Sequence, residues 1–336
     1  MAKRIGSSTI QCSNPISIRE AAGVAGQKES QGPLGSCFDK TYQDDLLGRE
    51  TWEQAESALQ SAAVSLMLEK AALQPDDIDV ILAGDLLNQC ISSTFGLKDL
   101  HIPFLGQYGA CSTMAQTIAV SSLLTDSGAV NRAAAVTSSH FCSAERQFRL
   151  PLAYGGQRTP SAQWTVTGAG AALLDRSGCG PFVREITIGR IYDLHITDAN
   201  NMGAAMAPAA ADTLLRFFGD TGESPAHFDL ILTGDLGKVG SALLLELLQR
   251  EGLEISAMHR DCGLMIFDPE RQDVHAGGSG CGCSGSVFCS HIVRQLKQQQ
   301  LHNILFIATG ALMSPTSSQQ GESIPGIAHL LHITSS

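Results

Sequence analysis

The sequence contains no apolar run of the roughly 18 residues that a membrane-spanning helix requires. Its first stretch, MAKRIGSSTIQCSN, is positively charged but has no apolar segment of the kind found in secretory signals. Charged residues make up only 16% of the chain, and acidic residues outnumber basic ones by 33 to 22, which gives a net charge of −11. Such a surface repels phosphate backbones, so we expect no nucleic-acid binding. These absences predict an intracellular, soluble protein without a transmembrane segment.

Paired CxxC motifs are also missing, although the chain contains ten cysteines. Without an export signal, these cysteines are expected to be reduced thiols in small-residue core positions. The stretch CGCSGSVFCSH offers four possible metal ligands, Cys281, Cys283, Cys289 and His291. Its spacing differs from that of zinc sites, and a helix beginning near Cys283 would place Cys289 toward its opposite face. We therefore expect no metal site.

What the sequence does contain is an internal duplication. LQPDDIDVILAGDL (residues 73–86) and ESPAHFDLILTGDL (223–236) are identical at 7 of 14 positions without a gap. Each copy follows a helix-like stretch and reads as a buried strand that ends at Gly-Asp. The helix before the first copy begins at TWEQAE, where Thr51 and Gln54 fit a capping box. Asp85 and Asp235, which end the two copies, are expected to cap helices or to bridge the two halves.

A second correspondence follows in the same order. ACSTM and NRAAAVTSS in the first half match GCSGS and HNILFIATG in the second, and each Cys-Ser is expected to open a helix that leads to a buried strand. The chain thus consists of two related halves, residues 1–175 and 176–336. Alternating helices and strands, a repeat and a cysteine at the start of a central helix resemble the thiolase fold. That resemblance implies an α/β, thiolase-like five-layered αβαβα sandwich of two halves related by a pseudo-two-fold axis.

The stretch GQYGACSTMAQTIAV (106–120) places Cys111 between small residues at the start of a predicted helix. Free N–H groups and the helix dipole at such a position favour a thiolate, lower the pKa of the thiol and so produce a nucleophile. The preceding glycine and alanine allow a tight turn and the close approach of a substrate. A small thiol buried in the core explains the position equally well.

An acyl-transferring enzyme needs more than the cysteine, because His or Asn partners must stabilise an oxyanion and move protons. Thiolases and ketoacyl synthases place these partners in two stretches of the second half. Here the first of them reads TGDLGKVG (233–240), and the second reads GGSGCGCSGS (277–286), with Ser279 at the Asn-like position. Neither slot holds His or Asn. We therefore expect no enzymatic activity and interpret Cys111 as a vestigial nucleophile position.

A basic stretch, residues 138–174, stands out in this acidic chain. Three arginines, Arg146, Arg149 and Arg158, occur near three further polar residues, His140, Tyr154 and Gln157. The planar fork of arginine suits bidentate binding of a carboxylate. The same stretch could instead be a dimer-contact loop whose arginines pair with Glu145 and other acids. Both roles are compatible, because in the thiolase fold this loop commonly lies at the dimer interface beside the pocket.

More specific strings identify a closer resemblance. The chain resembles the stage V sporulation protein AD family from Gly32 to His329, in strings such as GPLGSCFDKTY (32–42), GACST (109–113), AERQFRLPLAYGGQ (144–157), HRDCGLMIF (259–267), AGGSGCGCS (276–284) and ATGALMSP (308–315). Members of that family are thiolase-fold proteins of endospore formers that bind dipicolinic acid (pyridine-2,6-dicarboxylate) and take part in its uptake into the spore. The resemblance implies a binding role without cofactors and a forespore location at the inner spore membrane. Its implied partners are membrane proteins of the same operon, dipicolinate or its calcium chelate, and a second copy of the chain.

Dipicolinate is a planar dianion, so its site needs two cationic or N–H-rich ends with an apolar face between them. We expect Arg146 and Arg149 to hold one carboxylate, and N–H groups near Cys111 and Ser112 to hold the other. The remaining predicted site residues are Thr113, His140, Tyr154, Gln157, Ser279 and Cys281. The alternative is a thiolase-superfamily acyltransferase, similar to the ketoacyl synthases, that uses Cys111 as its nucleophile.

Overall fold

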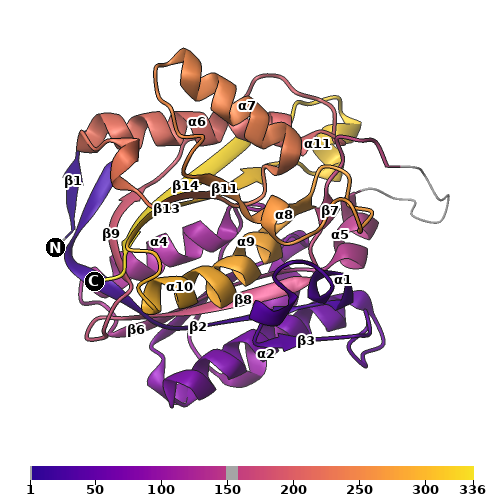
Figure 1. Ribbon diagram of the computed structural model, residues 1–336. Helices are drawn as coiled ribbons and strands as arrows, with labels where there is room; N and C mark the ends of the chain where they lie inside the picture. The colour runs from indigo at the N-terminus through magenta and orange to yellow at the C-terminus, as the bar shows by residue number, and fades with distance from the viewer. Residues whose placement is uncertain (1, 149–157) are drawn as a thin grey trace.

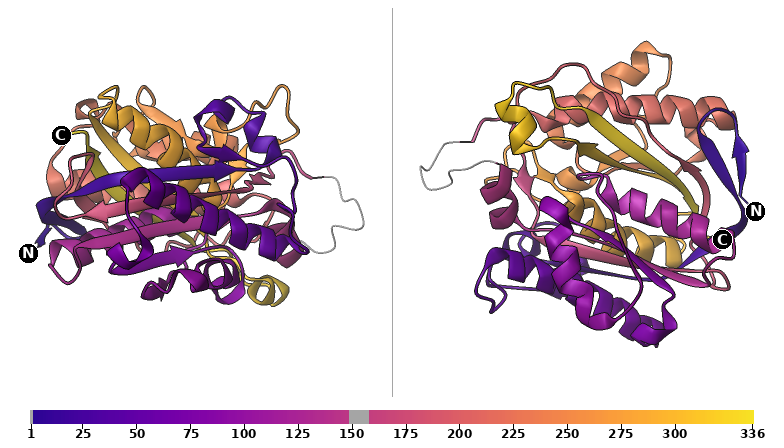
Figure 2. Two further views of the ribbon diagram at one scale, coloured as in Figure 1. Left: turned by 90° about the horizontal axis from the view of Figure 1, so that it is seen from below. Right: turned by 180° about the vertical axis from the view of Figure 1, so that it is seen from behind.

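The computed structural model describes residues 2–148 and 158–336. Figures 1 and 2 show five layers in the order helix, sheet, helix, sheet, helix, which confirms the predicted sandwich. Two helices cover the outer face of the second-half sheet, one long helix covers the first-half sheet, and the central layer lies between the sheets. These helices are α6 (Met202–Thr221) and α7 (Gly237–Arg250) on one side, α2 (Trp52–Ala71) on the other, and α4 (Thr113–Asp126), α9 (Cys281–Val287) and α10 (Val293–Lys297) in the centre.

The two sheet layers are joined through β2 and β9 into a single hydrogen-bonded sheet among the described residues. The strand order is β5-β4-β6-β8-β2 in the first half and β9-β14-β13-β10-β11 in the second, and β2 pairs with β9. The 17-residue strand β2 makes this join, because Thr9–Gln11 pair with β9 and Ser17–Ala25 pair with β8. The bounds are β2 (Thr9–Ala25), β4 (Val80–Gly84), β5 (Phe104–Gly106), β6 (Arg132–Ser139), β8 (Gly168–Asp175), β9 (Phe182–Thr187), β10 (Leu230–Thr233), β11 (His259–Asp261), β13 (Asn303–Ala311) and β14 (Gly326–Thr334).

The duplication seen in the sequence recurs in atomic contacts. The carboxylate of Asp79 accepts the N–H groups of Asn131 at 2.6 Å and Arg132 at 2.9 Å, at the start of β6. The carboxylate of Asp229 accepts those of His302 at 2.7 Å and Asn303 at 3.0 Å, at the start of β13. Each aspartate thus fixes the strand of its own half that follows the central helix. The identity of these two residues in the repeated motifs therefore has a structural cause.

Small residues let the central helices approach the sheets closely. All seven residues of α9, CGCSGSV, are buried, as expected for a helix enclosed on every side. Gly285 lies directly against Gly170 of β8, and Gly282 lies against Gly168 of the same strand. This contact leaves no room for a side chain and explains the glycine content of both stretches.

The capping prediction for α2 is confirmed at the residue that begins it. The Thr51 side chain accepts the N–H of Gln54, and the Gln54 side-chain oxygen accepts the N–H of Glu50 at 3.1 Å. The Thr51 side chain therefore satisfies a backbone donor that the first turn leaves unpaired, and the Gln54 side chain satisfies one just before the helix. Gln54 reaches one residue further back than in the usual box.

Shorter elements connect these layers. They are β1 (Lys3–Ile5), α1 (Gln27–Ser30), β3 (Lys40–Thr41), α3 (Ile91–Leu97), α5 (Phe141–Phe148), β7 (Trp164–Thr165), α8 (Cys262–Met265), β12 (Gly278–Ser279), α11 (Pro315–Gln319) and a π-helical turn over Phe288–Ile292. β7 and β12 form a separate two-stranded ribbon. In the described ranges, no helix is both long and apolar enough to cross a membrane.

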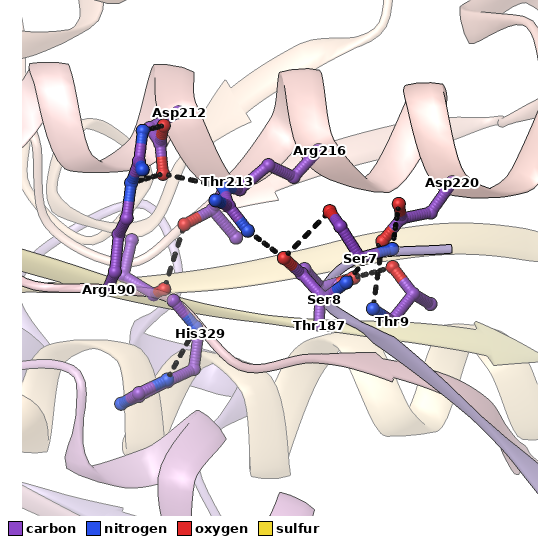
Figure 3. A network of polar contacts seen from close by, with 12 residues as sticks. Ser7, Ser8, Thr9, Thr187, Arg190, Asp212, Thr213, Arg216, Asp220 and His329 are labelled. Carbon is purple, nitrogen blue, oxygen red and sulfur yellow. Dashed lines mark hydrogen bonds and ion pairs between the residues drawn. The ribbon is translucent and has the colours of Figure 1, made fainter. Parts of the chain in front are cut away.

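The N-terminal hairpin is tied to α6 by one carboxylate (Figure 3). Asp220 accepts the N–H groups of Ser7 at 2.6 Å, Ser8 at 2.8 Å and Thr9 at 2.9 Å. Burial of this carboxyl acts to raise its pKa, but the three N–H groups outweigh burial and lower the pKa to about 2. Asp220 thus holds the turn between β1 and β2 against the end of α6.

Replacing Asp220 by asparagine should lower the free energy of unfolding by about 1 kcal/mol at neutral pH, because charge-assisted hydrogen bonds at a half-buried site are lost. The folded-state pKa lies below the unfolded value of about 3.9. The stabilisation is therefore complete above about pH 4 and is lost as the pH falls toward 2. Urea denaturation of both proteins across this range measures the difference. A difference that does not change with pH would contradict the role given to the carboxylate.

Candidate functional site

A small cavity lies beside Cys111, where the two halves meet. Its volume is about 50 Å³, far below the roughly 300 Å³ at which ligand pockets usually begin. It is therefore too small to hold such a ligand in this structure. Most of the wall is apolar, with one buried acid and a few hydroxyls. The lining residues are Leu86, Tyr108, Ala110, Cys111, Ala144, Glu145, Phe148, Thr165, Met202, Ser279, Ala311 and Met313.

The wall is built from several elements that lie far apart in the chain. Cys111 precedes α4, Ala144 and Phe148 lie on α5, and Ala311 is the last residue of β13. Thr165 and Ser279 are paired residues of the β7–β12 ribbon. The backbone at Ala110 adopts the left-handed conformation (φ 50°), which turns the chain sharply just before Cys111. The turn that the sequence predicts is therefore present, with alanine in the strained position.

The acid that acts most strongly on Cys111 is Asp235, from the loop after β10, because the charge and the hydrogen bonding of its carboxylate both affect the pKa of the Cys111 thiol. That carboxylate also accepts the N–H of Gly280 at 2.9 Å and the hydroxyl of Thr309 at 2.8 Å. Asp235 therefore bridges the two halves, as expected. Asp85 instead stays within its own half, where it binds Ser93 and the N–H of Leu87.

Burial and the charge of Asp235 raise the pKa of the Cys111 thiol well above its usual value. Burial likewise raises the pKa of Asp235, to about 7. The pKa of Cys111 is thus shifted upward, whereas a position at a helix N-terminus predicts a downward shift. The neighbouring N–H groups of Ser112 and Thr113 donate to Gly109 and Ala110, so they already have partners. The surroundings of Cys111 thus favour a neutral thiol.

Ser112 and Thr113 do not line the cavity. The Ser112 hydroxyl donates to the carbonyl of Gly109 at 2.6 Å, and the Thr113 hydroxyl donates to that of Ala110 at 2.6 Å. Both side chains are buried and secure the turn before α4. Their contacts are therefore internal to the turn rather than directed at a ligand.

His140 also lies outside the cavity wall. Its Nδ1 accepts the N–H of Cys142 at 3.1 Å, so the proton sits on Nε2, which donates to the carbonyl of Asp45 at 2.7 Å. Burial lowers the pKa of this imidazole. A neutral His140 thus ties the loop before α2 to the start of α5.

The structure places Arg146 away from Cys111. Its guanidinium pairs with Glu53 and lies 5.2 Å from the centre of the Trp52 ring. It lines a neighbouring surface groove of about 420 Å³ together with Glu53 and Gln147. The other three predicted residues of this stretch, Arg149, Tyr154 and Gln157, lie outside the described residues.

Ser279 and Cys281 come close to Cys111 from the second half. Ser279 lines the cavity directly. Cys281 is buried in a small apolar cluster with Leu86 and Ala144, against which Cys111 packs, and its thiol donates to the carbonyl of Ser138 at 2.9 Å. No three metal-binding side chains come together among the residues that the structure describes.

Sequence reasoning missed Asp235 as the partner of Cys111 and missed the apolar wall. Asp235 lies in the stretch TGDLGKVG (233–240), where a catalytic His or Asn was expected in related enzymes. That stretch was therefore the signal that could have identified it. The wall residues Met202, Ala311 and Met313 carry no local signal, because Met202 begins α6 whereas Ala311 ends β13 and Met313 follows it.

The fold and the position of Cys111 define a thiolase-like protein. The structure is similar to OleA of Xanthomonas campestris bound to cerulenin, with a TM-score of 0.60 and 13% identity over 96% of this chain and 97% of that one. It is also similar to 3-oxoacyl-[acyl-carrier-protein] synthase III of Aquifex aeolicus, with a TM-score of 0.53 and 12% identity over 98% and 99% of the two chains. At such identities the likeness concerns the fold alone.

The sequence comparison is more specific. Residues 6–334 match the family model of stage V sporulation protein AD. The chain is 48% identical over 327 residues to stage V sporulation protein AD of Bacillus subtilis, which covers 97% of this chain and 96% of that protein. The chain therefore belongs to the stage V sporulation protein AD family.

Proposed function

We propose that this protein binds dipicolinic acid without catalysis and acts in its uptake into the developing endospore. Family membership supports the link to sporulation. The observation that carries the non-catalytic part is the environment of Cys111. Its thiol has a raised pKa and faces a carboxylate, and neither His nor Asn lines the cavity within the described residues.

Ligand entry requires the cavity to enlarge. Met202 and Met313 have flexible unbranched side chains, so these two can move with little change to the backbone. A planar ring would then lie against the apolar wall, with the hydroxyls of Thr165 and Ser279 near one edge. No cation lines the described wall, and Glu145 and Asp235 are acidic. We therefore propose that the dianion enters with its charge balanced, as the calcium chelate or with a proton.

A calorimetric titration tests this proposal. Dipicolinate is expected to bind with one-to-one stoichiometry, and calcium should strengthen binding. Isophthalate has the same two carboxylates but lacks the ring nitrogen that completes the chelate, so it should bind weakly and show no response to calcium. Equal binding of both ligands, or of neither, would contradict the proposed function.

An acyltransferase remains the alternative, because Cys111 opens a central helix in a fold shared with condensing enzymes. Acylation would form a thioester at the Cys111 sulfur, add the mass of one acyl group and release the thiol of the donor. Incubation with acyl-thioesters followed by intact-mass measurement separates the two functions. A stable adduct that is absent from Cys111→Ala would favour the enzyme.

We also propose a homodimer that forms through the edge strand β5. This strand pairs only with β4 in the described sheet, and five exposed apolar residues lie on it or in the chain segments beside it. We propose these as the interface patch: Ile91, Phe95, Phe104, Leu105 and Tyr108. An unpaired apolar edge favours antiparallel pairing with a second copy. The membrane proteins of the same operon are the proposed further partners, with the forespore side of the inner spore membrane as the site of action.

Replacing Phe95, which is 57% exposed, by aspartate should shift the protein toward the monomer, because two charges would be buried at the two-fold contact. Sedimentation velocity over a concentration series measures the dissociation constant, which should rise at least about tenfold. Leu194→Asp is the matched control, since Leu194 is 53% exposed but lies outside the patch. Equal effects of the two substitutions would contradict an interface at β5.

A further inference from the structure

Trp164 on β7 carries two cations on one ring face. The Phe141 ring stacks on the indole with its centre 3.7 Å away and the planes 7° apart. Lys28 Nζ lies 3.4 Å from the indole centre, and the Arg158 guanidinium carbon lies 4.5 Å from it. A ring and a cation this close cannot share one face without overlapping. Phe141 therefore covers one face of Trp164, and Lys28 and Arg158 share the other.

The same two cations converge on Asp273. Lys28 Nζ donates to the Asp273 carbonyl oxygen at 2.8 Å, and Arg158 Nη2 donates to it at 2.9 Å. The Asp273 carboxylate lies 3.3 Å from Arg158 Nη2 and 2.9 Å from His275 Nε2. This side chain is 75% exposed, whereas that of Arg158 is 18% exposed. A solvent-facing carboxylate is thus held by half-buried basic groups.

Gathering these charges has an electrostatic cost. Burial lowers the pKa of Lys28, the charge of Arg158 lowers it further, and Asp273 and Glu29 oppose the shift. Glu29 is itself buried, which raises its pKa to about 7 and weakens it as a counter-charge at neutral pH. One cation would suffice to hold a single carbonyl oxygen. A second one in a chain of net charge −11 indicates attraction for an anion.

The cluster lies on the outer side of the β7–β12 ribbon, whose inner side lines the Cys111 cavity. Trp164 and Thr165 are consecutive residues of β7, so their side chains point to opposite sides of the ribbon. Thr165 lines the cavity, which places Trp164 on the outer side. Phe141 begins α5, the helix that supplies Ala144 and Phe148 to the wall. Figure 1 shows β7, α5 and α1 grouped at the same end of the molecule.

We propose that the face of Trp164 covered by Lys28 and Arg158 is an anion-binding subsite for small carboxylates, on the outer side of the ribbon that lines the cavity. The Asp273 carboxylate occupies this subsite in the structure and competes with an incoming anion. Naming a carboxylate as the ligand rests on the proposed function, whereas attraction for anions does not. The two cations thus lie on the other side of the ribbon from the described cavity wall, which itself contains no cation.

Fluorescence of Trp164 reports on the subsite directly, because the chain has only two tryptophans. In a Trp52→Phe chain, Trp164 is the sole emitter, and the anion iodide and neutral acrylamide serve as the two quenchers. We expect a ratio of iodide to acrylamide quenching constants above that of a Trp164→Phe chain, in which Trp52 emits beside the paired Arg146 and Glu53. Sulfate and dipicolinate should each compete with iodide for Trp164.

Two substitutions with opposite expected effects separate this subsite from a purely structural clamp. In the Trp52→Phe chain, Lys28→Met should lower the ratio roughly threefold, and Asp273→Asn should raise it by a similar factor, since each changes one charge close to the ring. Asp273→Asn keeps the carbonyl that both cations bind. The proposal would be overturned if the ratio did not rise in Asp273→Asn, or if the iodide and acrylamide quenching constants changed in parallel.

Failure of the subsite can be distinguished from failure of the proposed function. The iodide ratio needs no dipicolinate, so it tests the charge arrangement alone. An Ala311→Phe substitution, which fills the inner cavity, should leave the iodide ratio unchanged. If wild-type protein shows the high ratio but does not bind dipicolinate in calorimetry, the subsite stands and the proposed ligand is wrong.

Discussion

Alanine at position 170 is expected to lower the free energy of unfolding by about 3 kcal/mol or more. Gly170 lies in the middle of β8, where a Cβ would meet the Gly285 backbone of α9 at 2.1 Å from its oxygen and 2.3 Å from its carbonyl carbon. Both groups are main chain, so no side-chain rotation can relieve the overlap. The central helix layer would have to move away from the first-half sheet. Urea denaturation followed by far-ultraviolet circular dichroism measures the loss.

Gly219→Ala is the matched control for this substitution. Gly219 lies in α6, its backbone is helical, and no atom lies within 4 Å of the position that a Cβ would take there. Alanine at this position should raise the free energy of unfolding by about 0.5–1 kcal/mol, because it lowers the entropy of the unfolded chain. If Gly170→Ala proved as stable as wild type, the contact between β8 and α9 would be looser than the structure shows.

Phenylalanine at position 311 is expected to weaken dipicolinate binding at least about 100-fold, equivalent to about 2.7 kcal/mol. Ala311 is buried at the end of β13 and lines the cavity beside Cys111. The added ring exceeds the cavity volume of about 50 Å³ and takes the space that movement of Met202 and Met313 would open. Calorimetric titration measures the affinity, and a thermal melt confirms that the variant is folded.

The same substitution at Ala226 serves as the control. Ala226 is exposed and does not line the cavity, so Ala226→Phe should leave the affinity within about twofold of wild type. If Ala311→Phe bound dipicolinate normally, the ligand site would lie elsewhere. The surface groove beside Arg146 would then become the leading candidate.

Two opposing effects act on Cys111, and their magnitudes explain its state. A helix N-terminus stabilises a negative charge by roughly 0.3–1 kcal/mol at exposed sites and up to about 2 kcal/mol in partly buried ones. Burial away from water and the facing Asp235 carboxylate act the other way and raise the pKa of the thiol. Desolvation of a charge costs several kcal/mol, so burial prevails. The pKa of the Cys111 thiol is therefore raised despite its place before α4.

Much of the fold could be predicted from local patterns. The repeated strand motif predicted β4 and β10, Thr51 marked the start of α2, and the resemblance identified both the thiolase-like sandwich and the sporulation family. The site could be predicted only in part. Ser279 and Cys111 do line one cavity, whereas Ser112, Thr113 and His140 bind backbone groups nearby. The place of these three residues in the sequence, near Cys111 or near the arginines, suggested that they line the site. In the structure their side chains hold the local backbone instead.

The sequence by itself determined the duplication, the layered α/β class and the helix that follows Cys111, because strand periodicity, capping residues and repeats act over short stretches of chain. Only the tertiary structure decided that Asp235 faces Cys111 and that Lys28 joins Arg158 on Trp164. These residues belong to elements far apart in the chain, and the packing of two sheets around the central helices brings them together. These groups come close enough to shift one another's pKa only in the folded structure, so the chemistry of the pocket follows from the packing.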